Sequence, residues 1–205
     1  QKKASVLANH SLGLINSKLT KAITKACDQI INLSLIDEFP LSVWQTGSGT
    51  QSNMNANEVI SNYAIKILKG KVGSKMPIHP NDHVNLSQSS NDTFPTIMHI
   101  SANELTDSKL IPSLKKLISE LKKKTKSYSK IVKIGRTHTQ DATPLTMGDE
   151  FSGYLHQIEN NFERIKLSKK ELNYLAQGGT AVGSGINAPK NFDKVFCKFL
   201  NKFTI

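Results

Sequence analysis

Cysteine, arginine and long apolar runs are scarce in this sequence of 205 residues. The two cysteines, Cys27 and Cys197, are far apart, so a disulfide framework is not expected and a reducing compartment is the default. No apolar run approaches the ~20 residues needed to cross a bilayer, so no membrane partner is expected. The stretch after Gln1 also lacks the continuous apolar region of a signal peptide. Because the chain has no initiating methionine and stops after a lysine-rich apolar stretch, we expect both ends to be internal to a longer chain.

Charge is strongly of one sign, with a formal net charge of +11. The excess is almost all lysine, since Arg136 and Arg164 are the two arginines. The densest basic cluster, residues 122–126, has no tyrosine or phenylalanine between its lysines on which bases could stack. No nucleic-acid partner is therefore expected, although a basic helical nucleic-acid binder stays open as an alternative. A milder use of the charge is to steer small dianions toward a cleft.

Apolar residues recur at helical spacing along most of the chain, which predicts a mainly α fold. The helices expected from this spacing cover residues 16–35, 58–68, 91–121, 147–175 and 189 onward. The stretches 44–57 and 177–187 have no such period. The fold class is therefore a small N-terminal helical and loop domain, residues 1–89, followed by the first part of a long-helix bundle, residues 90–205.

Two prolines refine this prediction. The third helix is expected to begin near Asn91 or Asp92, both good N-cap types, which puts Pro95 in its first turn. Pro112 should kink or interrupt the same helix. Residues 130–135 alternate enough to form a short extended piece.

Three segments between the helices, residues 47–53, 88–93 and 135–141, concentrate hydroxyl and amide side chains. Glycines in the first allow close approach of a ligand, and Ser48 and Thr50 offer neutral hydrogen bonds. The second lies at a helix N-terminus, which favours an anion. The third contains His138, the candidate for acid–base chemistry because histidine titrates nearest neutrality.

Each segment also has a purely structural interpretation. A Ser-Ser-Asn-Asp run before a helix is commonly a cap, a glycine-serine loop is commonly a turn, and a single loop histidine is seldom catalytic. His79, Asp82 and His83 on a proline-bearing turn are weak evidence for a metal site. Without further information, the residues indicate an α-helical protein that could be a dianion-binding enzyme.

Five segments, taken together and in order, closely resemble class II fumarases. They are Trp44–Asn55 with its Ser48-Gly49-Thr50 core, His79–Asn85, Ser87–Thr96, Gly135–His138 and Gly178–Gly185. Aspartate ammonia-lyases share the fold and several of these segments. They usually have alanine at Ser48, threonine at Ser90 and alanine at Gly179, so the resemblance favours fumarase.

This resemblance implies reversible hydration of fumarate to L-malate, without a metal or an organic cofactor. Residues implied to bind the substrate carboxylates and the reacting water are Ser48, Gly49, Thr50, Ser89, Ser90, Asn91 and Thr137. His138 is implied to be catalytic, in acid–base chemistry on that water. A secondary carboxylate site is implied at His79, Pro80, Asn81 and Asp82. A homotetramer in the cytoplasm, or in the mitochondrial matrix of a eukaryote, is also implied.

Two departures from the family pattern limit what this chain can do alone. The family's serine-rich loop, with a catalytic serine and the lysine expected to pair with substrate charge, belongs to sequence beyond Ile205. We therefore expect residues 1–205 alone to be inactive. Met76 stands near the secondary site where some members carry a basic residue. A non-catalytic structural helper stays open as an alternative if the complete protein lacks the serine-rich loop.

Overall fold

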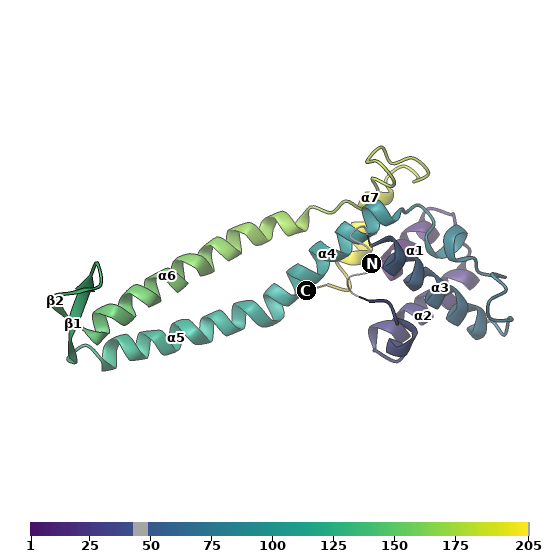
Figure 1. Ribbon diagram of the computed structural model, residues 1–205. Helices are drawn as coiled ribbons and strands as arrows, with labels where there is room; N and C mark the ends of the chain where they lie inside the picture. The colour runs from purple at the N-terminus through teal and green to yellow at the C-terminus, as the bar shows by residue number, and fades with distance from the viewer. Residues whose placement is uncertain (43–48, 205) are drawn as a thin grey trace. The chain divides into compact units, whose positions relative to one another are not determined.

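The protein is described by a computed structural model covering residues 1–42 and 49–204 (Figure 1). Its helices are α1 Lys2–Ser11, α2 Ser17–Ile31, α3 Thr50–Ile67, α4 Ser90–Leu105, α5 Ile111–Ser127, α6 Met147–Ser168 and α7 Phe192–Leu200. Shorter turns of helix cover Ile36–Glu38, Pro80–Val84, Thr106–Leu110 and Lys169–Asn173. Two strands, β1 Val132–Thr137 and β2 Gln140–Thr146, pair antiparallel. The mainly α prediction is confirmed, and none of the described helices is long and apolar enough to cross a membrane.

The chain divides into two compact units. The first unit is Gln1–His99 with Leu175–Ile205, and the second unit is Ile100–Tyr174. The sequence-based division into residues 1–89 and 90–205 stays a prediction.

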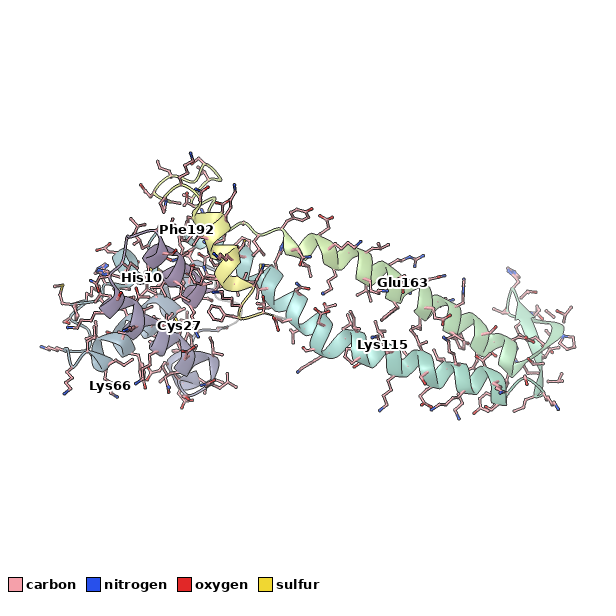
Figure 2. The ribbon with its side chains drawn as sticks, turned by 180° about the vertical axis from the view of Figure 1, so that it is seen from behind. His10, Cys27, Lys66, Lys115, Glu163 and Phe192 are labelled. Atoms are coloured by element: carbon pink, nitrogen blue, oxygen red, sulfur yellow. The ribbon has the colours of Figure 1, made fainter. Side chains whose placement is uncertain are left out.

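The first unit has a well-defined apolar core between α1, α2 and α3. Buried members of this core include Val6, Ile23, Ile60, Ile65 and Ile78. Full burial of one such side chain contributes about 1.5–3 kcal/mol. Helix α7 packs against α1, and Figure 2 labels Phe192 at its start.

The second unit is a pair of long helices joined by a hairpin (Figure 1). Helix α5 leads into β1, and β2 leads directly into α6, which runs back along α5. Thr146 caps α6: its hydroxyl accepts from the amide of Asp149 at 3.0 Å, and the Asp149 carboxylate accepts from the amide of Thr146 at 2.9 Å. Figure 2 labels Lys115 on α5 and Glu163 on α6, two of the charged side chains along this pair.

The prediction that residues 44–57 are not helical is wrong for Thr50–Asn57, which form the start of α3. The reason lies in the side chains that this helix buries. Asn53, Asn57 and Ser61 are four residues apart and lie on its buried face. A search for apolar periodicity misses a helix whose buried face is polar at these positions.

Other boundaries differ by a few residues. Helix α4 begins at Ser90, so Pro95 lies beyond its first turn rather than within it. The extended piece predicted at 130–135 lies two residues further on, at Val132–Thr137, and it is one strand of a hairpin, because β2 pairs with it. As predicted, Pro112 marks an interruption: it is the second residue of α5, after the π-helical turn Thr106–Leu110.

Candidate active site

The start of α4 in the first unit carries three of the predicted substrate-binding residues, Ser89, Ser90 and Asn91. A buried carboxylate fixes this start. Asp92 is 2% exposed, and its Oδ1 accepts from the Ser89 amide at 2.9 Å. Its other oxygen, Oδ2, accepts from the amides of Gly178 and Thr180 at 3.0 and 2.9 Å. Hydrogen bonds to an ionised acceptor are about twice as strong as neutral ones, so Asp92 joins two distant segments firmly.

The glycine-rich segment that Asp92 holds was predicted as a break between helices, and it consists of turns, as expected. Gly178 has a φ of +102°, and a Cβ there would lie 2.9 Å from Cβ of Asp193 on α7. Both constraints require glycine. The side-chain amide of Asn91 donates to the carbonyl of Ala181 at 2.8 Å, which ties the same segment to α4 a second time.

Ser90 is held by a buried side chain of α3. The side-chain amide of Asn53 donates to Oγ of Ser90 at 2.8 Å and to Oδ1 of Asn85 at 3.3 Å. Asn53 is 3% exposed, so these bonds form in an environment that excludes water. Net hydrogen-bond energies are about 0.5–1.5 kcal/mol, but leaving a buried donor unpaired costs about 1–3 kcal/mol.

Lys2 is the buried cation of this region, with 8% of its surface exposed. Its ammonium donates to Oδ1 of Asn85 at 2.8 Å and to Oε1 of Gln88 at 3.0 Å. Burial lowers the pKa of Lys2 to about 7, while the negative charge of Asp92 opposes this shift.

Gly49 and Thr50 stand at the start of α3, and Ser48 lies outside the described residues. Gly49 has a φ of +68°, and a Cβ on it would lie 2.1 Å from Cγ of Phe94. The backbone here therefore comes as close to α4 as an aromatic ring permits, and only glycine fits. Thr50 is exposed at the first position of α3.

Thr137 and His138 belong to the second unit, not to the unit that carries Ser89–Asn91. Thr137 ends β1, and His138 and Thr139 form the two-residue turn to β2. Both turn residues are left-handed, with φ of 47° and 63°. Two such non-glycine residues in succession are costly, and backbone strain of this kind concentrates at functional sites. His138 is exposed, so its side chain is accessible to groups from elsewhere.

The predicted secondary site is a π-helical turn that begins at Pro80. Nδ1 of His79 accepts from the amides of Asn81 and Asp82 at 3.3 and 3.2 Å, and Nδ1 of His83 accepts from the amide of His79 at 2.9 Å. These bonds assign the ring proton of each neutral imidazole to Nε2, which is left as a donor. Throughout residues 1–42 and 49–204, no three His, Cys, Asp or Glu side chains converge as metal ligands would.

Cys27 is not a reactive nucleophile in this structure. Burial raises the pKa of its thiol to about 12, so the thiolate is not formed near neutral pH. It lines an apolar cavity of about 310 Å³ together with Ile30, Ile60 and Phe94. We interpret Cys27 as a core residue.

Three functional candidates were missed by sequence reasoning: Lys2, Asn53 and Asp92. For Asp92 the signal was present, because a carboxylate three residues after Ser89 has the spacing of a helix cap. Asn53 could have been found from its four-residue spacing to Asn57, which puts both on one helical face. For Lys2 no signal distinguishes it from the other lysines of a basic chain.

Comparisons with known proteins identify the family of this chain. The model of a family described as lyase matches residues 1–205. Fumarate hydratase class II 2 of Bradyrhizobium diazoefficiens is 56% identical over 203 residues, which are 99% of this chain and 43% of that protein. The mitochondrial fumarate hydratase of Saccharomyces cerevisiae is 57% identical over 203 residues, 99% of this chain and 41% of its own length.

Solved structures give the same result. The recombinant class II fumarase of Schistosoma mansoni superposes with a TM-score of 0.93 at 48% identity, covering 98% of this chain and 42% of that one. The chain thus spans less than half the length of the relatives it matches. The fold expected from the resemblance is confirmed, and the chain belongs to the lyase family.

Proposed function

We propose that this chain carries part of the active site of a class II fumarate hydratase, which interconverts fumarate and L-malate. Relatives named fumarate hydratase, one of them as class II, are 56% and 57% identical over nearly the whole chain. The observation that carries the proposal is the buried Asp92 carboxylate. It fixes the neutral donors Ser89–Asn91 and the glycine-rich segment against each other, which suits a rigid cradle for a dicarboxylate.

Neutral donors are what this reaction requires. Removal of a proton next to a carboxylate produces an enediolate-like dianion, and preorganised donors stabilise its oxygens as the charge develops. The proposed substrate-binding residues are Ser48, Gly49, Thr50, Ser89, Ser90, Asn91 and Thr137. An ammonia-lyase would need the same cradle, and the 56% identity to a hydratase favours hydration.

His138 is proposed to act on the reacting water. In the hydration direction, the water oxygen bonds to one olefinic carbon while His138 takes a proton from that water. The electron pair of the double bond moves onto the adjacent carboxylate, and protonation of the second carbon then completes L-malate. General acid–base catalysis of this kind contributes about 10²–10⁴-fold.

The π-helical turn is proposed as a secondary carboxylate site, formed by His79, Pro80, Asn81 and Asp82. Support comes from the two imidazoles whose Nδ1 atoms are already engaged, since each then presents an Nε2–H donor. Asp82 lies 3.3 Å from Nδ1 of His79 and would oppose an anion, so the proposed site is weak. A homotetramer, and a location in the cytoplasm or the mitochondrial matrix, are proposed for the complete protein on the basis of the family resemblance.

Absorbance of fumarate in the ultraviolet tests the proposal directly in the complete protein. We expect loss of fumarate absorbance, no ammonia release from L-aspartate, and a fall of roughly 10²–10⁴-fold in kcat for His138→Asn. His156→Asn, on an exposed turn of α6, is the matched control and should keep its rate. Ammonia release from L-aspartate without hydration of fumarate would replace the hydratase proposal with an ammonia-lyase.

The chain of residues 1–205 by itself is expected to be inactive. Ser89–Asn91 and His138 belong to separate compact units, and the relatives are more than twice as long. The same absorbance measurement on purified residues 1–205 checks this. Turnover of fumarate would show that the residues of this chain suffice.

A further inference from the structure

A run of four hydrogen-bonded side chains leads from Lys2 to Ser90 within the first unit. Lys2 donates to Asn85, Asn53 donates to the same Asn85 oxygen, and Asn53 also donates to Ser90. Lys2 and Asn53 are more than nine-tenths buried, so little water can replace these partners. The direction of each bond is fixed by the chemistry of its neighbours.

The donor-to-acceptor direction of the hydrogen bonds is determined first at Asn85. The ammonium form of Lys2 has donors only, so in that form it requires an oxygen from Asn85. The other end of that amide donates to the backbone carbonyl of Gln88 at 3.3 Å, and a carbonyl can only accept. Both ends of Asn85 therefore agree, and its oxygen faces Asn53.

The orientation of Asn85 then determines which atom of Asn53 faces Ser90. Because Asn53 meets an oxygen of Asn85, it must present its NH₂ group, and the same NH₂ group donates to Oγ of Ser90. With Asn53 flipped, two amide oxygens would face each other in a buried site, which is repulsive. Ser90 thus accepts from the protein, and among residues 1–42 and 49–204 its hydroxyl hydrogen is given no acceptor.

We propose that this hydrogen-bonded chain, ending in Asn53, holds the Ser90 hydroxyl as a donor toward a substrate carboxylate. This rests on the proposed function and adds a positioning residue to it. Asn53 does not touch the substrate; it decides which way the Ser90 hydrogen points. An acceptor in its place would turn that hydrogen inward and leave a lone pair facing an anion.

The test is a double-mutant cycle on the complete protein with succinate, a saturated dicarboxylate that cannot be hydrated. Asn53→Leu should weaken succinate binding roughly 10-fold or more, the range for one hydrogen bond to a charged group. In a Ser90→Ala background the same substitution should change binding less than about 2-fold, because there is no hydroxyl left to orient. Asn57→Leu, a buried amide one turn further along α3, is the matched control for loss of stability.

The outcomes separate the two proposals. An equal effect of Asn53→Leu in both backgrounds would mean that its role is structural, and would overturn the inference. If Asn53→Leu does not fold, Asn85→Leu takes its place in the same cycle, since it removes the oxygen that orients Asn53. If the complete protein neither binds succinate nor hydrates fumarate, the proposed function itself fails, and the inference falls with it.

Discussion

The two compact units of this chain differ in whether their polar side chains are buried or exposed. In the first unit, Lys2, Asn53 and Asp92 are buried and hydrogen-bonded, next to an apolar core. In the second unit, Gly148 is the one buried residue between Ile100 and Tyr174, all of which are described. Its ion pairs are exposed or half-buried, and one of the exposed pairs joins Lys122 to Glu159 at 2.8 Å.

This difference has a functional meaning. A buried network can be satisfied in few ways, so the first unit holds Ser89–Asn91 in fixed positions by its own contacts. The helix pair of the second unit leaves large apolar side chains such as Leu117 and Leu167 exposed, at 44% and 63%. Long helices of a bundle bury such stripes against further helices. We therefore expect the position of His138 to depend on surfaces outside this unit.

The contrast between the two units predicts the largest loss of stability for Asp92→Ala. It would leave the buried amide of Thr180 and the half-buried amides of Gly178 and Ser89 without their acceptor. We expect a loss of about 3–5 kcal/mol in unfolding free energy, because each amide left without an acceptor costs about 1–3 kcal/mol. Urea denaturation of the complete protein measures this, and faster hydrogen exchange in residues 177–187 would localise it.

Asp141→Ala is the counterpart in the second unit. Asp141 pairs with Arg136 at 3.6 Å, and both side chains are at least 70% exposed. Exposed pairs contribute little, so no measurable loss of stability is expected. Equal losses from the two substitutions would refute the contrast between the units.

A second prediction concerns pH and Lys2. Its pKa is about 7 in the folded chain against 10.5 in the unfolded one, so between these values the unfolded chain binds more protons. Stability should therefore rise with pH from about 7, by up to roughly 2–3 kcal/mol between pH 7 and 9. The raised pKa of Cys27 acts in the opposite direction above pH 9, which sets the upper limit of the window.

Lys2→Met isolates this contribution. The substitution removes the titrating group and nearly keeps the length of the side chain. Subtracting the unfolding free energy of the variant from that of the wild type therefore cancels the contributions of the other titrating groups. We expect the unfolding free energy of Lys2→Met, from urea denaturation at pH 7, 8 and 9, to be flatter than that of the wild type. Parallel curves would show that Lys2 is solvated in solution and carries no such shift.

Sequence reasoning located the long helices, because apolar periodicity and glycine or proline breaks act locally. It did not find the start of α3, since Asn53 and Asn57 take positions where an apolar residue would reveal the helix. It also missed Asp92 as the link to Gly178, 86 residues away. Such contacts depend on how distant segments pack, and a single sequence carries no direct record of that.

The smallest measurable effect is expected from two glycines of α6, and it sharpens the comparison within the second unit. A Cβ on Gly148 would lie 2.7 Å from the carbonyl oxygen of Thr125 and 2.8 Å from Cα of Ser129, both backbone atoms of the α5 end. Gly153 has nothing within 4 Å of an added Cβ. Gly148→Ala should therefore destabilise by about 1–3 kcal/mol through overpacking. Gly153→Ala should stabilise by about 0.5–1 kcal/mol, through helix propensity alone.

Thermal unfolding of the two variants side by side measures this difference, and opposite shifts in Tm are expected. Because both substitutions add one methyl group to the same helix, only the packing around each glycine differs between them. If both stabilise, the junction of α5 and α6 is loose in solution. The hairpin that carries His138 would then lack a fixed anchor at the helix ends, and its position would have to come from outside this unit.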